Sequence, residues 1–88
     1  MRKIRCAVLG ATGVVGQHFL KLLVDHPYFE LVAICASDAR AGQKLHTARE
    51  HVPGGLPKSF SHLEFDPIDV AILKNKKVDI VFSALPAN

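Results

Sequence analysis

The hydrophobic positions of this chain alternate between short apolar runs and segments in which apolar residues recur with helical spacing. Three runs are mostly apolar, which is typical of strands buried in a parallel sheet: Ile4–Leu9, Leu31–Ala36 and Val78–Ala84. A shorter run, Leu63–Phe65, predicts a brief additional strand. Because glycine, proline or polar residues bound these runs, the pattern predicts three or four short strands joined by helices and loops.

The clearest helical segment is Val14–Asp25, with Thr12 as a candidate N-cap and Pro27 as a stop signal. The side predicted to be buried comprises Val15, Gly16, Phe19, Leu20, Leu22 and Leu23, and the polar side comprises Gln17, His18, Lys21 and Asp25. Asp66 followed by Pro67 has the form of a cap and a first helical residue, which predicts a short helix through about residue 74. Residues 38–62 are expected to hold a helical turn or two and a proline- and glycine-rich loop.

The order strand, glycine loop, helix, strand describes a βαβ unit, whose strands are parallel and whose crossover is right-handed. The sequence therefore predicts an α/β fold: a Rossmann-like parallel sheet with the strand order 3-2-1-4. A complete doubly wound sheet has more strands and helices on both faces. We therefore interpret residues 1–88 as an incomplete NAD(P)-binding Rossmann domain, and we expect the catalytic and dimerisation domain to lie outside this chain.

Composition and charge narrow the functional classes. The 88 residues carry a net charge of +3, and the lysines are scattered except at Lys74, Lys76 and Lys77, which favours a solvated helix end over a nucleic-acid site. No run approaches the roughly 18 apolar residues that a membrane span needs. Cys6 and Cys35 lie in apolar strand-like runs and are interpreted as buried, reduced thiols of a cytoplasmic protein rather than as a disulfide. The five histidines have no metal-binding spacing.

Three glycines stand between the first strand and the first helix, at Gly10, Gly13 and Gly16. Gly10 would allow a sharp turn, Gly13 would leave room for an approaching pyrophosphate, and Gly16 would allow close packing of the helix on the strands. The helix N-terminus would add partial positive charge. The position of the loop predicts dinucleotide binding, although the spacing Gly-x-x-Gly-x-x-Gly departs from the usual Gly-x-Gly-x-x-Gly. A tight turn without a ligand remains the alternative.

Two further segments follow predicted strands and extend this candidate site. Ser37 and Arg40 follow the second strand, where an arginine favours the 2′-phosphate of NADP, whereas the charge of Asp38 would oppose it. We predict NADP as the cofactor, with an ordinary exposed loop arginine as the alternative for Arg40. The last strand ends in Ser83, Ala84, Leu85 and Pro86, at the sheet edge where ligands of α/β proteins bind.

The stretches VLGATGVVGQHFLKLL, HPYFELVAICASDARAG and VDIVFSALP together resemble the N-terminal part of the aspartate-semialdehyde dehydrogenase family, particularly its archaeal and fungal-like branch. The resemblance implies reversible, NADPH-dependent reductive dephosphorylation of aspartyl 4-phosphate to aspartate semialdehyde, in lysine, methionine and threonine synthesis. It also implies a role for each matched residue: Thr12, Gly13, Val14 and Val15 on the pyrophosphate, Ser37 and Arg40 on the 2′-phosphate, and Ser83, Ala84, Leu85 and Pro86 beside the nicotinamide ribose.

The resemblance places the nucleophilic cysteine, the acid/base histidine and the substrate-binding arginines of the family beyond residue 88. Cys6 and Cys35 do not replace that cysteine, because buried strands lack the features that lower a thiol pKa. We therefore expect no catalytic residue here, with a small-molecule substrate bound elsewhere in a homo-oligomeric enzyme, and no nucleic-acid or membrane partner. N-acetyl-glutamyl-phosphate reductase, a non-catalytic nucleotide-sensing module and a truncated chain that does not fold alone are the alternatives.

Overall fold

A computed structural model describes residues 2–85 of the chain. Its four strands are β1 (Ile4–Leu9), β2 (Phe29–Ala36), β3 (Phe65–Pro67) and β4 (Ile80–Ser83). They form one sheet in the order β3-β2-β1-β4, and every neighbouring pair is parallel. The predicted fold class and strand order are therefore confirmed, although β2 begins two residues earlier than expected and β4 is shorter.

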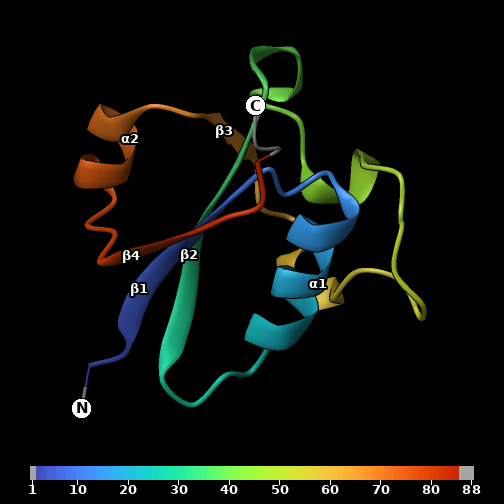
Figure 1. Ribbon diagram of the computed structural model, residues 1–88, viewed down its shortest axis with the longest axis horizontal. Coiled ribbons are helices and arrows are strands. Elements are labelled where there is room, and N and C mark those ends of the chain that lie inside the picture. The colour runs from blue at the N-terminus through green and yellow to red at the C-terminus, as the bar shows by residue number, and fades with distance from the viewer. Residues whose placement is uncertain (1, 86–88) are drawn as a thin grey trace.

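The two helices lie on opposite sides of the sheet, one on each (Figure 1). α1 (Val14–Leu23) connects β1 to β2, and α2 (Val70–Asn75) connects β3 to β4. Between β2 and β3 the chain makes three short 3-10 turns, η1 (Asp38–Arg40), η2 (Leu45–Thr47) and η3 (Lys58–Phe60). These turns account for the helical turns expected in residues 38–62.

The start of α2 was predicted incorrectly. Asp66 and Pro67 belong to β3, and Asp69 caps the helix by accepting a 2.8 Å hydrogen bond from the Ala71 amide. Pro67 is tolerated in the sheet because β3 is an edge strand, where a missing N–H costs little. The Asp66 carboxylate instead pairs with the Lys76 ammonium, which joins the two ends of this crossover.

The buried face of α1 also differs from the prediction. Its buried residues are Gly16, Gln17, Leu20 and Leu23. Leu22 is 72% exposed, and Val15 is 59% exposed, whereas Gln17 is completely buried. The stripe that faces the sheet follows the spacing i, i+3, i+4, i+7 from Gly13, so Gln17 falls inside it. Phe19, on the neighbouring side of the helix, stacks on Phe82 of β4 at a centroid distance of 5.4 Å.

The two cysteines lie on opposite faces of the sheet. Cys6 and Val8 point to one side of β1, and Val8 pairs with Ile34, so the next residue, Cys35, points to the other side. Both thiols are free and fully buried, as predicted. Burial raises the pKa of each thiol to about 11.

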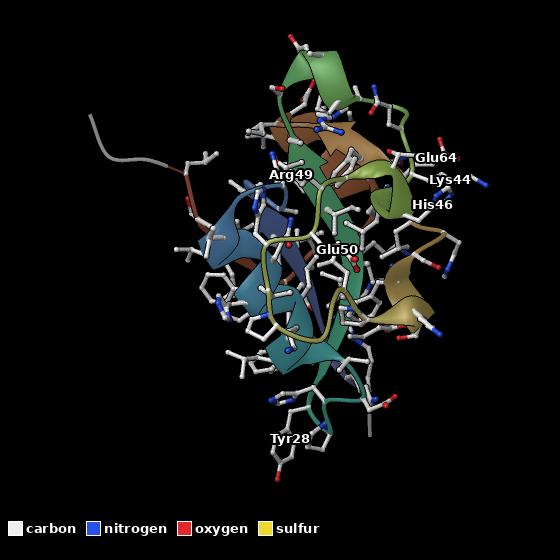
Figure 2. All side chains as sticks on the ribbon, turned by 90° about the vertical axis from the view of Figure 1, so that its right-hand side faces the viewer. Tyr28, Lys44, His46, Arg49, Glu50 and Glu64 are labelled. Carbon is white, nitrogen blue, oxygen red and sulfur yellow. The ribbon has the colours of Figure 1, made fainter. Side chains whose placement is uncertain are left out.

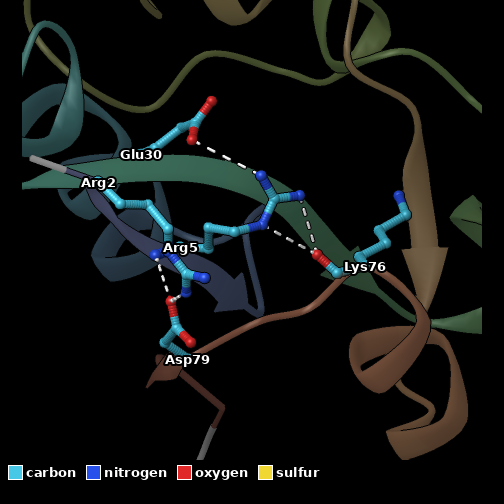
Figure 3. Close-up of polar contacts among 5 residues, drawn as sticks. All are labelled: Arg2, Arg5, Glu30, Lys76 and Asp79. Atoms are coloured by element: carbon cyan, nitrogen blue, oxygen red, sulfur yellow. Dashed lines mark hydrogen bonds and ion pairs between the residues drawn. The ribbon is translucent and has the colours of Figure 1, made fainter.

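An arginine-centred network ties the turn before β4 to β1 (Figure 3). The Arg5 guanidinium donates to the Lys76 carbonyl at 2.9 Å and approaches the Glu30 carboxylate at 3.7 Å. The Asp79 carboxylate accepts the Arg5 amide at 2.9 Å and the Arg2 guanidinium at 2.7 Å. These bonds set the point at which β4 joins the sheet.

Candidate cofactor-binding site

The carboxyl ends of β1, β2 and β4 meet at one edge of the sheet, where the glycine loop begins. The Gly10 amide donates to the Cys35 carbonyl at the end of β2 at 2.9 Å. On the other side, the Ala84 amide donates to the Leu9 carbonyl at the end of β1, also at 2.9 Å. The structure therefore brings the predicted glycine loop, the end of β2 and the end of β4 together.

Two of the three loop glycines are required by the chain itself. Gly10 has a φ of +77°, in the left-handed region that glycine adopts without strain. A Cβ at Gly16 would lie 2.2 Å from the Gly10 carbonyl oxygen, which no side chain tolerates. The sharp turn at Gly10 and the close helix packing at Gly16 are therefore both as predicted.

Gly13 has no such structural requirement. Its φ of −83° and ψ of 173° are open to any residue. A Cβ there would meet its nearest neighbour, the Gly10 carbonyl oxygen, at 3.7 Å, which is an ordinary contact. Glycine is favoured over alanine at an N-cap, but neither the backbone angles nor the contacts of Gly13 require the absence of a Cβ as those of Gly10 and Gly16 do.

The first turn of α1 offers backbone amides at this edge. The first intrahelical hydrogen bond runs from the Gln17 amide to the Gly13 carbonyl, so the amides of residues 14–16 precede it. The side chains of Val14 and Val15 are exposed, and the first turn contains no acidic residue. Because no acidic side chain offsets the partial positive charge of the helix N-terminus, this end of α1 favours an anion.

Thr12 was predicted to cap α1, and this prediction is wrong. Gly13 occupies the N-cap position, and no side chain makes the capping hydrogen bond. Since the helix starts at Val14, Thr12 lies one residue too early for the usual capping geometry. Its carbonyl instead accepts a 3.1 Å hydrogen bond from the Gln17 side chain.

Ser37 and Arg40 lie in the turn that follows β2. Ser37 is exposed and precedes η1, and its carbonyl accepts the Arg40 amide at 2.9 Å. One guanidinium nitrogen of Arg40 donates to Gln43 over 3.3 Å, which leaves its other N–H groups for a ligand. Asp38 is exposed in the same turn, and within residues 2–85 it forms no ion pair with Arg40.

The segment after β4 packs directly on the glycine loop. A Cβ at Gly10 would lie 3.1 Å from the Ala84 carbonyl oxygen and 3.3 Å from the Leu85 side chain. The Ser83 hydroxyl accepts a long hydrogen bond of 3.4 Å from the Leu85 amide. Pro86, the last residue of the predicted site, lies outside the described residues.

Sequence reasoning missed Gln17 and the segment of residues 48–56. Gln17 is completely buried, and it hydrogen-bonds to the glycine loop and to this segment. The spacing of Gly13, Gly16, Gln17 and Leu20 was an available signal, because it marks Gln17 as a polar residue in the buried stripe.

The described residues offer binding groups at this edge but no activated nucleophile. The Cys6 and Cys35 thiols are buried, and each pKa of about 11 keeps them protonated near neutral pH. Residues 2–85 contain no cluster of three or more side chains able to hold a metal ion. Among the same residues, no helix has the length and apolar character to cross a membrane.

Comparisons with known proteins agree with this geometry. The family described as "Semialdehyde dehydrogenase, NAD binding domain" matches residues 5–88. Aspartate-semialdehyde dehydrogenase of Archaeoglobus fulgidus is 40% identical over 82 residues, covering 92% of this chain and 23% of that enzyme. Malonyl CoA reductase (NADP) of Metallosphaera sedula is 33% identical over 85 residues, covering 97% of this chain and 23% of that enzyme.

The fold has a counterpart among solved structures. The crystal structure of aspartate-semialdehyde dehydrogenase with NADP from Candida albicans aligns with a TM-score of 0.83 and 35% identity. That alignment covers 97% of this chain and 24% of the other, so the chain spans about a quarter of the length of the relatives it matches. The resemblance seen in the sequence is confirmed: the chain belongs to the semialdehyde dehydrogenase NAD-binding domain family.

Proposed function

We propose that residues 1–88 form the NADP-binding part of an aspartate-semialdehyde dehydrogenase. The reaction is the reversible, NADPH-dependent reductive dephosphorylation of aspartyl 4-phosphate to aspartate semialdehyde, a step toward lysine, methionine and threonine. The family match and the relatives from Archaeoglobus and Candida support this activity. The enzyme is cytoplasmic and homo-oligomeric in this proposal.

The observation that carries the proposal is the glycine at position 13. The fold explains Gly10 and Gly16 by backbone conformation and close packing, but no contact within residues 2–85 requires the absence of a Cβ at Gly13. A pyrophosphate that approaches the amides of residues 14–16 supplies the missing reason, because a methyl group there would obstruct it.

The remaining site residues take their roles from their places at the sheet edge. Thr12, Gly13, Val14 and Val15 line the pyrophosphate, and Gly10 and Gly16 shape the loop beneath it. Ser37 and Arg40 bind the 2′-phosphate, which selects NADP over NAD. Ser83, Ala84, Leu85 and Pro86 border the nicotinamide ribose. The Candida relative, whose structure was solved with NADP, supports this choice.

The chemical step takes place on residues outside this part of the enzyme. With both thiols buried and protonated, residues 2–85 supply no nucleophile for an acyl intermediate. This part binds and orients the dinucleotide, which supplies the hydride when bound. We place the small-molecule substrate and its catalytic residues in the remainder of the enzyme.

A second candidate is reduction of another activated acyl group with the same cofactor. The Metallosphaera relative, a malonyl CoA reductase (NADP) with 33% identity, favours it. Full-length protein assayed with aspartate semialdehyde, phosphate and NADP, and separately with malonyl-CoA and NADPH, distinguishes the two activities by the change in NADPH absorbance.

The Gly13→Ala variant tests the proposed cofactor site. A Cβ at position 13 should weaken NADPH binding at least about tenfold, equivalent to about 1.4 kcal/mol. The melting temperature should fall only slightly, since the new contact is an ordinary 3.7 Å and the one cost is that alanine is a poorer N-cap than glycine. Fluorescence titration of NADPH and thermal melts of the full-length protein measure the two effects.

Gly16→Ala provides the contrast for this test. Its Cβ would clash with the Gly10 carbonyl at 2.2 Å, so this variant should lose stability outright. NADPH binding by Gly13→Ala that equals wild-type binding, or no NADPH binding by the wild-type protein, would contradict the proposed site.

A further inference from the structure

The buried side chain of Gln17 forms hydrogen bonds both to the glycine loop and to residues 48–56. We propose that Gln17 is a positioning residue that couples the glycine loop to residues 48–56, so that NADP binding and the order of this segment support each other. The inference rests on the proposed function, because it takes the glycine loop as the NADP site.

The side-chain amide of Gln17 uses both of its N–H donors and its carbonyl oxygen in hydrogen bonds to these two parts. Its Nε2 group donates to the Thr12 carbonyl at 3.1 Å and to the Arg49 carbonyl at 2.8 Å. Its Oε1 atom accepts the His51 amide at 2.8 Å. Since the residue is completely buried, water cannot replace a lost partner, and the orientation of the amide is fixed by all three bonds.

The contact to Thr12 acts on the glycine loop through a rigid unit. The Thr12 carbonyl and the Gly13 amide belong to one planar peptide, so holding the carbonyl also sets the direction of the amide. The Gly13 amide donates to the Gly10 carbonyl at 3.2 Å and leads directly into the first turn of α1. Gln17 therefore fixes the path along which a pyrophosphate would meet the backbone.

The segment of residues 48–56 has little regular structure of its own. It contains no helix or strand, and Gly54 and Gly55 both have a φ of +80°. The Glu50 carboxylate closes it by accepting the Leu56 amide at 2.8 Å, and Figure 2 labels Glu50 on the loop of this segment. Its hydrogen bonds to α1 come from Gln17 and from Lys21, which donates to the Pro53 carbonyl, and the side chains of Ala48 and Val52 are buried.

These contacts give a coupling that must act in both directions. If the segment holds the Gln17 amide in place, it favours the loop conformation that binds NADP. By linkage, NADP bound at the loop must then stabilise the segment by the same factor. The exchange rate of the His51 amide reports this directly, because its hydrogen-bond acceptor is Gln17 itself.

Gln17→Met in the full-length protein tests the coupling, because methionine keeps a similar length and removes all three hydrogen bonds. Hydrogen exchange of peptides covering residues 48–56, with and without NADPH, is measured beside the NADPH dissociation constant. In the wild-type protein, NADPH should slow exchange at His51. In the variant, exchange should be fast in both states, and the dissociation constant should rise about tenfold.

Two further variants separate positioning from general loss of stability. Leu23→Ala removes a buried side chain of the same helix that takes no part in the hydrogen bonds to the loop or the segment. It should lower the melting temperature but keep the wild-type dissociation constant and the NADPH-dependent protection. Glu50→Ala, at an exposed position, removes the hydrogen bond that closes the segment and leaves Gln17 unchanged. It should weaken NADPH binding about threefold.

The outcomes distinguish this inference from the function on which it rests. Wild-type protein that binds NADPH, together with a Gln17→Met variant of unchanged affinity and protection, would overturn the coupling alone. Equal effects of Gln17→Met and Leu23→Ala would also overturn it. If Gln17→Met does not fold, unchanged affinity in Glu50→Ala overturns the coupling. Wild-type protein that does not bind NADPH would remove the proposed cofactor site as well.

Discussion

At the scale of single residues, similar amino acids at this site serve different physical purposes. Gly10 satisfies a positive φ, and Gly16 avoids a clash with a carbonyl oxygen, whereas Gly13 meets no demand from the chain. Arg40 has one weak contact to Gln43, unlike Arg5, whose guanidinium is held by the Lys76 carbonyl. Gly13 and Arg40, which the fold constrains least, are among the residues that we assign to direct contacts with the dinucleotide.

Arg40 and Ser37 should determine which dinucleotide binds. Arg40→Ala is expected to weaken NADPH by about tenfold and NADH by less than about twofold, because only NADPH carries the 2′-phosphate that the guanidinium would bind. Lys44→Ala removes an exposed cation from the same stretch and serves as the matched control for net charge. Fluorescence titrations with both dinucleotides measure the effect. Equal losses for NADPH and NADH would refute this role of Arg40.

At the scale of elements, polar contacts decide where β4 enters the sheet. Asp79 precedes β4, and its carboxylate accepts the Arg5 amide and the Arg2 guanidinium. The Arg5 backbone hydrogen bond first, and the Arg2 side chain second, hold the pKa of Asp79 below its ordinary value of 3.8. A lowered pKa contributes stability that is present above the unfolded-state value and lost as pH falls through the folded-state value.

Asp79→Asn should therefore change how stability depends on pH. The variant keeps an oxygen that can accept the Arg5 amide but loses the charge, so it should be less stable than wild type above about pH 5. That difference should shrink as the pH falls from 3.8 through the lower folded-state pKa of Asp79, because the wild-type carboxylate becomes protonated there. Urea unfolding across this range, at low and high salt, measures the effect. A stability difference that stays constant down to about pH 2 would contradict this assignment.

The elements were more predictable from the sequence than their exact ends and faces. Mostly apolar runs identified β1, β2 and β4, whereas the predicted third strand, Leu63–Phe65, shares only Phe65 with β3. The βαβ order predicted the sheet topology correctly. The cap of α2 was misplaced because Asp66 and Asp69 are both good caps, and only the pairing of β3 with β2 decides between them. Gln17 was assigned to the polar side although its helical spacing places it in the buried stripe; only its hydrogen-bond partners, from residues 49–51, lie beyond the reach of local periodicity.

The candidate site was predicted to a similar degree, for a similar reason. The glycine loop and the two strand ends were found because parallel strands bring their carboxyl ends to one edge. The position of residues 48–56 beside Gln17 was not predicted, because this segment lies in the long connection between β2 and β3. Its irregular sequence gives no period from which its position could be inferred.

At the scale of the whole molecule, the carboxyl-terminal end of a four-stranded sheet gathers the described residues that we assign to the dinucleotide. The ends of β1 and β2 are joined through the Cys35 carbonyl, and the ends of β1 and β4 through the Leu9 carbonyl. The amino-terminal end of the sheet carries the network of Arg5 and Asp79. This network holds the turn before β4 against β1 and takes no part in the candidate site. The described part of the molecule thus separates the groups that hold the fold from those that face the ligand.

A crystal structure of the full-length protein with NADP tests the central claim most directly. We predict that the pyrophosphate lies within hydrogen-bond distance, about 2.7–3.2 Å, of backbone amides among residues 14–16. The 2′-phosphate should contact Ser37 and Arg40, and the nicotinamide ribose should lie beside residues 83–86. A dinucleotide bound elsewhere, or bound here with its pyrophosphate away from the first turn of α1, would contradict the proposed site.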